Sequence, residues 1–536
     1  MKLLRRMLAF AVPILAQTPV IAPDGIFNNA NYLPACATNG GVAQGALFAV
    51  FGQNLGPTGL VQASAFPLGT TLAGVSVHIT AGAAGFDAIP LYVSSNQLGA
   101  ILPGAVPAGD ATVSVSYLGR ASQTAPIRVR RNAFGIFTIN QKGGGPAVVE
   151  NVAPDGGTTL NASTRPLRPG QPGIIWGSGL GPVAGNESAG PLPGDQASLD
   201  TRVWIGDRTA RVSYRGRSGC CAGIDQIVFE TPSGIEGCQV PIAVEVAGVL
   251  SNFGSIAISS LGVCASSQRP PPVPSSSPNF SLGTILFLDG YGSVLLPNAL
   301  EDYIRLAFFQ KGRVDGDLEA PLRAFEPDAE VPIGSCAVRS GTDFPEQPSQ
   351  PRQTPLDAGP ELRVSGPGGV FRLLQSQRNA GNYEDAQRVV IPAGRYRIDN
   401  GAGGRDVGPF TIDADTITLR LTTSFDHVPR NQDLTVTWEY DGPPGQRLTL
   451  FGSSRGACGR DLISFSCLAR AADKRFVIPA RILSNLPPST SFFGIPNGAF
   501  NISTTTPGGL KRFQAAGLEL GVFLQIGISA TRASFE

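Results

Sequence analysis

The segment Gly452-Ser-Ser-Arg-Gly456 fits the G-x-S-x-G pattern of a hydrolase serine nucleophile. In those enzymes the serine lies on a sharp turn between a strand and a helix, and the histidine of the triad follows later in the chain. A strand is expected at 448–451, but no helical pattern follows it, and the chain has no histidine after residue 454. The segment therefore favours a Gly/Ser turn between antiparallel strands, and no catalytic residue is predicted here.

The two histidines of the chain are His78 and His427. Histidine is the side chain most often used as a general base near neutral pH. His78 falls on the polar side of an alternating segment, and His427 precedes Pro429 in an expected loop. Because the sequence places neither beside a serine or cysteine that it could activate, we expect both at the surface.

An acidic cluster is formed by Asp315, Asp317 and Glu319, which alternate in the segment Val-Asp-Gly-Asp-Leu-Glu. An extended backbone would place the three carboxylates on one side, where they could ligate Ca²⁺ or perform acid–base chemistry. The calcium-binding loop pattern of the EF-hand is absent, so a solvated turn is the favoured interpretation. These residues are a weak calcium candidate, and no other metal, no cofactor and no nucleotide-binding glycine motif is expected.

Aromatic side chains could instead stack on a sugar ring. The chain has three tryptophans, Trp176, Trp204 and Trp438. Trp438 lies on the apolar side of its segment, whereas Trp204 lies between Val203 and Ile205 and could point outward. A core position is still the favoured interpretation, because buried tryptophan is normal in β-sandwiches. Trp204 is therefore a weak ligand-binding candidate.

The chain has eight cysteines, an even number that indicates structural disulfides in an exported protein. Their spacing fits no zinc site, since paired C-x-x-C units are absent and histidines are scarce. Cys458 and Cys467 flank a short loop between two apolar segments and are expected to pair in a hairpin. Cys238 is expected to pair with Cys220 or Cys221, and the remaining connectivity stays open.

The composition is that of a folded chain with several domains. Its 536 residues are enough for three or four domains, and 42% hydrophobic against 15% charged residues is the reverse of a disordered balance. The 67 glycines and 45 prolines are too many for a helical protein. A formal net charge of +1 gives no basic excess for a phosphate backbone, so nucleic acid is not expected as a partner.

Residues 1–16 have the layout of a secretory signal peptide. Lys2, Arg5 and Arg6 form a basic start, and the apolar stretch 7–16 is too short to span a bilayer. No later stretch reaches about 18 uncharged apolar residues, so we expect no transmembrane segment in the mature chain. The predicted location is secreted or in the cell envelope.

Most of the remaining sequence alternates between apolar and polar residues, as half-buried strands of antiparallel sheets do. Examples are 75–80, 112–118, 416–423 and 434–440, which glycine, proline, asparagine and aspartate separate from their neighbours. Short strands with such turns predict β-sandwiches. At 297–310 apolar residues recur at helical spacing, and helix and strand stay equally open there.

Part of the first half of the chain is repeated. Phe51-Gly-Gln-Asn-Leu-Gly-Pro57 returns as Trp176-Gly-Ser-Gly-Leu-Gly-Pro182, and Gln97-Leu-Gly-Ala-Ile-Leu-Pro103 returns as Gln226-Ile-Val-Phe-Glu-Thr-Pro232. The offsets agree within a few residues, which indicates a duplication. Each copy has the size of one immunoglobulin-like sandwich.

These motifs resemble the IPT/TIG immunoglobulin-like domain, with a strand ending in an aromatic residue, then Gly-x-x-Leu-Gly, and later an apolar-Pro step. The tandem pair is similar to a family of bacterial secreted proteins of uncharacterised function with a duplicated IPT-like module, most distinctively at 25–32 and 220–226. The resemblance covers roughly residues 25–260. It implies sandwiches at 25–131 and 132–264, and it implies no activity.

A Pro/Ser-rich linker at 265–278 follows, and we interpret its extended, semi-rigid prolines as a hinge between two arms. Beyond it, 281–415 is expected to form a β-rich domain and 416–536 a further β-sandwich. Leu356-Asp-Ala-Gly-Pro360 and Leu434-Thr-Val-Thr-Trp438 more weakly resemble modules of similar exported proteins. The predicted fold class is all-β, with tandem immunoglobulin-like sandwiches followed by further β-sandwich units.

The sequence thus predicts an exported, non-catalytic multidomain surface or envelope protein that acts as a binding, adhesion or structural module. Its partner would be a protein or a polysaccharide at the cell surface. A carbohydrate-binding accessory protein is the first alternative, because the resemblance includes accessory modules of glucan-processing enzymes. An enzyme with a carboxylate site in the C-terminal half is the second.

Overall fold

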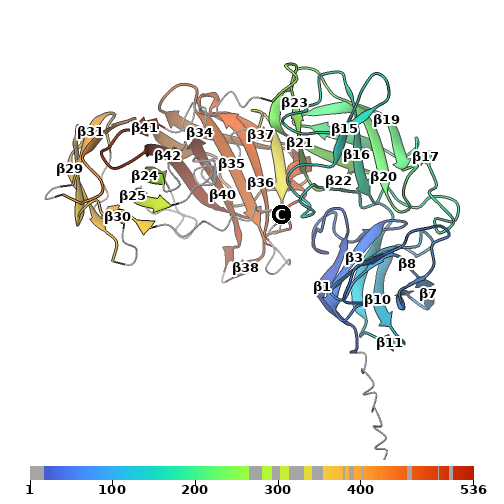
Figure 1. Cartoon of the computed structure of the whole chain (residues 1–536). Helices are drawn as coiled ribbons and strands as arrows, with labels where there is room; N and C mark the ends of the chain where they lie inside the picture. The colour runs from blue at the N-terminus through green and yellow to red at the C-terminus, as the bar shows by residue number, and fades with distance from the viewer. Residues whose placement is uncertain are drawn as a thin grey trace, which may run out of the picture.

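A computed structural model shows a chain built from strands, turns and short loops (Figure 1). Among the described residues, helical structure is confined to the 3-10 turn η3 (Ala471–Asp473) and the one-turn helix α1 (Ala480–Leu483). The predicted all-β class is therefore confirmed. The described residues are 17–264, 280–291, 302–312, 331–340, 354–377, 381–385, 391–400, 403–455, 462–492, 494–505 and 511–536.

The first sandwich consists of β1 to β12, which form two facing sheets. Their strand orders are β1-β3-β9-β8-β4 and β2-β12-β10-β6-β5, with β7 and β11 paired to β6 and β10. The alternation in β6 turns Val75, Val77 and Ile79 into the core and leaves His78 exposed. The strands are β1 (Val20–Asn28), β2 (Val42–Ala43), β3 (Leu47–Gln53), β4 (Val61–Gln62), β5 (Thr71–Leu72), β6 (Val75–Ala81), β7 (Ala84–Asp87), β8 (Ile89–Val93), β9 (Gln97–Ile101), β10 (Gly109–Tyr117), β11 (Arg120–Ala121) and β12 (Ala125–Arg130).

The second sandwich consists of β13 to β23, which form one continuous sheet folded into two layers. The fold is possible because the long strand β19 pairs with β18 along its first part and with β20 along its second part. The strands are β13 (Gly135–Ile136), β14 (Val149–Val152), β15 (Thr158–Leu160), β16 (Pro172–Ser178), β17 (Gly194–Asp195), β18 (Thr201–Ile205), β19 (Arg208–Arg217), β20 (Asp225–Glu230), β21 (Gly237–Val246), β22 (Val249–Leu250) and β23 (Gly254–Ile258).

The two sandwiches share equivalent residue pairs at matching places in their sheets. In each sandwich, an aromatic residue of one strand lies opposite a glutamine of its neighbour. The neighbour also pairs with a third strand, in which a β-bulge places a tyrosine opposite the residue two positions after that glutamine. A β-bulge is usually kept among related domains, so a bulge at the same place in both sandwiches supports the duplication. The equivalent pairs are Phe51–Gln97 and Trp176–Gln226, then Tyr92–Gly99 and Tyr214–Val228.

The C-terminal half, β24 to β42, is organised by one large sheet. Its order is β26-β36-β35-β40-β42-β24-β25-β30-β29-β28-β31-β32, and a small sheet β33-β34-β37 packs against it. The first strand, β24 (Phe280–Tyr291), lies parallel to the last, β42 (Leu520–Ala533), at the centre. This sheet contains strands from both expected units, 281–415 and 416–536, and the boundary between them stays a prediction.

The other strands of this half are described by their bounds alone. They are β25 (Asp302–Gly312), β26 (Cys336–Arg339), β27 (Thr354–Pro355), β28 (Glu361–Gly366), β29 (Gly369–Gln375), β30 (Asn382–Asp385), β31 (Gly394–Asp399), β32 (Phe410–Ala414), β33 (Thr418–Leu421), β34 (Leu434–Asp441), β35 (Arg447–Ser454), β36 (Ile463–Arg470), β37 (Arg475–Ile478), β38 (Ser491–Phe492), β39 (Ile495–Pro496), β40 (Gly498–Thr505) and β41 (Lys511–Phe513).

The open choice at 297–310 is settled as strand for its described part, 302–310. This segment belongs to β25, which pairs with β24 over its whole length. Burial alternates along it, with Arg305, Ala307 and Phe309 on one side. A strand at the centre of a sheet is apolar on both faces, so its sequence shows no clear period of two and imitates a helix.

Two disulfide expectations were wrong. The structure pairs Cys467 with Cys336 rather than with Cys458, which lies outside the described residues. It pairs Cys238 with Cys264, and it pairs the neighbours Cys220 and Cys221 with each other. The reason is long-range strand pairing, since β26 lies against β36 and brings two cysteines that are 131 residues apart directly opposite each other. Cys36 is also disulfide-bonded.

The two halves of the chain share a buried apolar cluster. Ala243, Leu250 and Phe253 of the second sandwich belong to the same cluster as the core of β33 to β37, and so does Ala37 of the first sandwich. Residues 265–279 of the expected hinge lie outside the described part of the chain. Swinging the halves apart would expose this cluster to water, which burial of apolar area opposes. The described halves therefore pack as one body (Figure 1).

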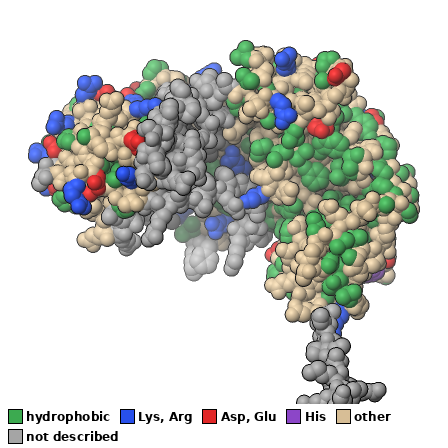
Figure 2. All heavy atoms as spheres, viewed as in Figure 1, with side chains coloured by type: hydrophobic (Ala, Val, Ile, Leu, Met, Phe, Trp, Pro, Cys, Tyr) green, Lys and Arg blue, Asp and Glu red, His purple; other side chains and the backbone are tan. Residues whose placement is uncertain are grey.

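The visible surface differs between the two ends of the molecule (Figure 2). Hydrophobic side chains gather over the first and second sandwiches, whereas charged side chains are frequent at the far end of the C-terminal half, where β28, β29 and β31 lie. There, Arg372 pairs with Glu361 and Arg395 pairs with Asp413, all on the exposed face of the sheet. Because acidic and basic side chains are paired on this face, it does not form a uniformly basic surface patch.

Candidate functional site

The serine pattern lies in a sheet in the structure. Gly452 and Ser454 belong to β35 itself. Ser454 is buried, and its hydroxyl oxygen lies 3.2 Å from that of Ser489. The histidines lie elsewhere: His78 Nδ1 is 2.9 Å from Asp87 Oδ1, and His427 Nδ1 is 2.7 Å from Glu536 Oε1. Among the described residues, each imidazole bonds to a carboxylate and Ser454 lies against another serine, so these side chains form no serine triad.

The acidic candidates Asp315, Asp317 and Glu319 lie outside the described residues, and the calcium hypothesis stays a prediction. Within the ranges that the structure describes, no three His, Cys, Asp or Glu side chains are grouped so as to hold a metal ion. Over the same residues, no helix has the length and hydrophobicity needed to cross a membrane.

Trp204 lies at the boundary between the second sandwich and the C-terminal half. Its neighbours Val203 and Ile205 are fully buried in the core of the sandwich, so the alternation of β18 turns Trp204 to the other face. There its half-buried ring packs against the apolar cluster of the C-terminal half. The indole Nε1 donates a 2.8 Å hydrogen bond to Glu245 Oε2. The ring is thus an anchor between two parts of the molecule.

Arg481 of α1 covers one face of this ring, with its guanidinium carbon 3.9 Å from the ring centre. A cation in this position over an indole is attracted by the ring's negative face. Burial lowers the pKa of the Arg481 guanidinium, and the carboxylates of Glu245, Asp433 and Asp207 oppose that change. The charge of Arg481 is therefore held at the boundary by acids from both halves.

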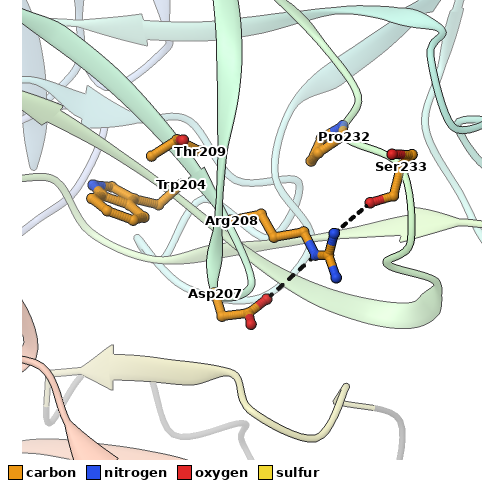
Figure 3. A pocket seen from close by; sticks show the side chains of 6 residues that line it. All are labelled: Trp204, Asp207, Arg208, Thr209, Pro232 and Ser233. Atoms are coloured by element: carbon orange, nitrogen blue, oxygen red, sulfur yellow. Dashed lines mark hydrogen bonds and ion pairs between the residues drawn. The ribbon is translucent and has the colours of Figure 1, made fainter.

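A shallow, open pocket of about 560 Å³ adjoins Trp204 (Figure 3). The hairpin between β18 and β19 supplies one wall, and the loop after β20 supplies the other. Arg208 crosses between the walls, since its Nη1 donates a 2.8 Å hydrogen bond to the Ser233 carbonyl. The lining residues are Trp204, Asp207, Arg208, Thr209, Pro232 and Ser233.

The pocket combines an aromatic ring, a carboxylate, a guanidinium and a hydroxyl. Such a set can stack on a flat apolar ring face and bind hydroxyl or acidic groups, which suits a polar small ligand or one unit of a polymer. The lining holds no cysteine, histidine or lysine, and its one carboxylate, Asp207, lies 3.8 Å from the Arg208 Nε. The arrangement is suited to binding.

The hairpin that carries the pocket is pressed onto the C-terminal half at its tip. A Cβ added to Gly206 would lie 2.8 Å from the Ser335 hydroxyl, just ahead of β26. Gly206 also has a φ of +60°, which glycine adopts without strain. The pocket thus opens beside the contact between the two halves, although its lining residues all belong to the second sandwich.

The first and second sandwiches meet at a buried ion cluster. Arg217 and Asp225 are 1% and 0% exposed, and their guanidinium and carboxylate form an ion pair. The Nε of Arg217 donates to Glu187 at 2.7 Å, and its Nη2 donates to the Gly45 carbonyl of the first sandwich at 2.8 Å. Asp225 also accepts from the backbone N–H of Leu180 at 2.8 Å. Buried charges are tolerated only with such full pairing.

Burial raises the pKa of the Asp225 carboxyl and of the Glu187 carboxyl, and the neighbouring Arg217 guanidinium opposes the rise in both. The cluster was not predicted from the sequence. A signal was present, because Asp225, Ile227 and Phe229 alternate on one side of β20 and a carboxylate on a core-facing side needs a partner. The sequence could not name Arg217 or Gly45 as partners.

Comparison with known proteins gives a limited result. No family model and no curated protein matches the chain. Among solved structures, the extracellular region of plexin A4 matches 89% of the chain at 9% identity and a TM-score of 0.17, and the chain spans 31% of that region. The four N-terminal Ig domains of Dscam1 isoform 8.4 match over 97% of this chain and 99% of theirs, at 9% identity and a TM-score of 0.12.

Domains 5–6 of the S-layer protein SbsC match 45% of the chain and 98% of their own length, at 12% identity and a TM-score of 0.16. At such scores the likeness says nothing of function.

Proposed function

We propose that the protein is an exported, non-catalytic multidomain protein of the cell surface or envelope, which acts as a rigid binding or structural module. The observation that carries the proposal is the pair of buried junctions. The ion cluster around Arg217 fixes the first sandwich to the second, and the cluster around Trp204 and Arg481 fixes the second to the C-terminal half. An adhesive or scaffolding protein needs such fixed geometry, since a rigid binder loses little entropy when it engages its partner.

The proposed location rests on two features. The pattern at 1–16 is that of a secretory signal peptide. The disulfides Cys238–Cys264 and Cys336–Cys467 are the kind that persist in oxidising compartments. In this proposal, 25–131 and 132–264 are IPT/TIG-like domains that present their sheets and loops to a partner.

A carbohydrate ligand is the second candidate, and the pocket beside Trp204 favours it. An aromatic ring flanked by a guanidinium, a carboxylate and a hydroxyl matches the apolar faces and hydroxyl groups of a sugar. In this form the protein is a carbohydrate-binding accessory protein. An enzyme with a site at Asp315, Asp317 and Glu319 is the least favoured alternative, and unchanged activity in Asp315→Asn and Asp317→Asn variants would remove those residues from it.

The experiment is binding of the purified mature chain to an array of glycans and envelope polymers. Arg208→Gln removes the guanidinium from the pocket, and Arg211→Gln on the same strand is its control, because Arg211 is exposed and pairs with Glu230 outside the pocket. Saturable binding that is lost in Arg208→Gln and kept in Arg211→Gln supports the carbohydrate site. Binding that both variants keep places the ligand elsewhere on the module. Silence across the array contradicts the carbohydrate candidate, and failure to capture any native envelope partner contradicts the binding role.

A further inference from the structure

The loop between β19 and β20, residues 218–224, holds a disulfide between adjacent residues. Cys220 and Cys221 are joined directly, which closes a small ring around one peptide bond. The loop is pinned at its base by the backbone hydrogen bond from Ser218 to Ile224, at 2.9 Å. The Ser218 hydroxyl also donates to the Cys221 carbonyl at 3.0 Å. The ring therefore restricts the backbone at the tip of a closed hairpin loop.

Cys220 is exposed and Cys221 is half-buried. Cys336 and Cys467 are both buried between β26 and β36, and Cys238 and Cys264 are half-buried. Attack on a disulfide requires a thiolate to reach one sulfur along the bond, so exposure decides which bond reacts first. Of the three disulfides whose two cysteines the structure describes, the one between Cys220 and Cys221 is the most open to a reductant from solvent, and the disulfide-bonded Cys36 is exposed as well.

The same loop is wedged between the first and second sandwiches. Ala222 is buried in an apolar cluster with Ile89 and Ile101 of the first sandwich. A Cβ on Gly223 would lie 2.8 Å from Ile101, so the backbone itself makes the contact. The Gly223 carbonyl accepts a 2.7 Å hydrogen bond from the Ser178 hydroxyl.

Ser178 also contacts the first sandwich, because its hydroxyl oxygen accepts a 2.9 Å hydrogen bond from the backbone N–H of Leu47. The two ends of the loop lead directly into Arg217 and Asp225, the buried ion pair of the junction. A change in the backbone conformation of residues 218–224 would therefore alter the contacts that join the two sandwiches.

We propose that Cys220–Cys221 is a redox-active disulfide, open to an external dithiol reductant, whose state sets how tightly the first and second sandwiches are joined. A thiolate of the dithiol attacks the exposed Cys220 sulfur, the Cys220–Cys221 bond breaks, and the Cys221 sulfur leaves as a thiolate that takes a proton from water. The second thiol of the reductant then attacks the reductant's first sulfur, which is bound to Cys220 in the mixed disulfide, and Cys220 is released as a thiol. The protein gains two electrons and two protons, and the dithiol becomes a cyclic disulfide.

Opening the ring frees the peptide bond between Cys220 and Cys221 from its constraint. The loop then gains conformations in which Ala222 and Gly223 no longer fit Ile101, and the junction loosens. This inference does not rest on the proposed binding function, since it concerns the state of the scaffold whatever the partner is.

The first test is a dithiothreitol titration of the full chain, with alkylation of free thiols and peptide mass spectrometry. Cys220 and Cys221 are expected to be alkylated at about tenfold lower dithiothreitol than Cys238, Cys264, Cys336 and Cys467. Alkylation of Cys238 and Cys264 at the same concentration would overturn the proposed accessibility.

The second test is hydrogen exchange of the backbone amides of Leu47, Gly179 and Leu180, whose partners are Ser178 and Asp225 at the junction. Selective reduction is expected to speed their exchange about tenfold and leave β35 and β36 unchanged. The double variant Cys220→Ser, Cys221→Ser should reproduce that rate without reductant, and the control Cys238→Ser, Cys264→Ser should keep the response. Selective reduction with unchanged exchange at these three amides would overturn the coupling.

Discussion

Arg217 and Asp225 lie at the two ends of one loop, and both are almost completely removed from water. Their charges are tolerated because each is surrounded by partners, including a backbone carbonyl from another sandwich. Arg211, six residues earlier on the same strand, makes an ion pair with Glu230 that remains in solvent. Two arginine–carboxylate pairs that begin on one strand thus contribute very differently to the free energy of unfolding, because one is buried and the other is exposed.

Replacing Arg217 with alanine should lower the free energy of unfolding by about 3–5 kcal/mol, because it leaves Asp225 buried without its cation. Arg211→Ala should change it by less than about 1 kcal/mol, since exposed ion pairs contribute little. Urea unfolding followed by circular dichroism measures both. Equal losses in the two variants would show that Arg217 is not a buried, fully paired charge.

His427 should titrate above its ordinary pKa of 6.5, because its hydrogen bond to Glu536 and that carboxylate's charge favour the imidazolium. A raised pKa in the folded state means that the contact stabilises fully below the unfolded pKa and is lost as the pH rises through the folded value. The effect therefore belongs to the pH range from about 6.5 upward.

Proton NMR can follow this directly, because the chain has two imidazoles and His78→Asn leaves one. Glu536→Gln should bring the midpoint of His427 back toward its ordinary value. A midpoint that does not move in that variant would mean that the carboxylate does not hold the proton.

At the scale of elements, the repeated Gly-x-x-Leu-Gly motif has a packing reason. Leu55 and Leu180 are fully buried in the two cores, and the first glycine of each motif lies where another backbone segment approaches. A Cβ on Gly177 would overlap the carbonyl oxygen of Gly135 and the ring of Phe134. The motif therefore specifies close contact between a strand and the segment that enters the sandwich.

Gly177→Ala should destabilise the second sandwich by about 1–3 kcal/mol, because backbone and a packed ring cannot move aside cheaply. Gly190→Ala in the same sandwich is the control, since nothing lies within 4 Å of its added Cβ. Thermal unfolding of both variants provides the measurement. A Gly177→Ala protein as stable as the control would contradict the close approach.

At the scale of the whole molecule, two junctions turn three β-layered parts into one body. The first is polar and fully paired around Arg217, and the second is aromatic and apolar around Trp204. Trp204 belongs both to the second junction and to the pocket between the β18–β19 hairpin and the loop after β20 (Figure 3).

Trp204→Ala should uncouple the second sandwich from the C-terminal half, at a cost on the order of 2 kcal/mol in lost packing and cation–π contact. Calorimetry should then show separate transitions for the two halves, and X-ray scattering a larger radius of gyration. Trp176→Ala is the control, because Trp176 is half-buried on a sheet of the same sandwich and bonds to Glu150 there. A single unchanged transition in Trp204→Ala would contradict the role of this junction.

The sequence by itself determined the all-β class, the strands with clear alternation and the duplication, because these depend on local periodicity and on motifs that repeat along the chain. For Trp204 it favoured a core position over an outward one, and the structure places the half-buried ring against the C-terminal half. It left helix and strand open at 297–310, because apolar residues on both sides of β25 hide the period, and it was wrong for Cys467, whose partner is 131 residues away.

Tertiary structure alone decided what Trp204 and Asp225 contact. Arg481 reaches Trp204 from a distant helix, and Gly45 reaches Arg217 from another sandwich. The pairing of β24 with β42 joins the two ends of the C-terminal half in the same way. Such contacts depend on how sheets pack and which strands pair at long range, and no local pattern of residues carries that information.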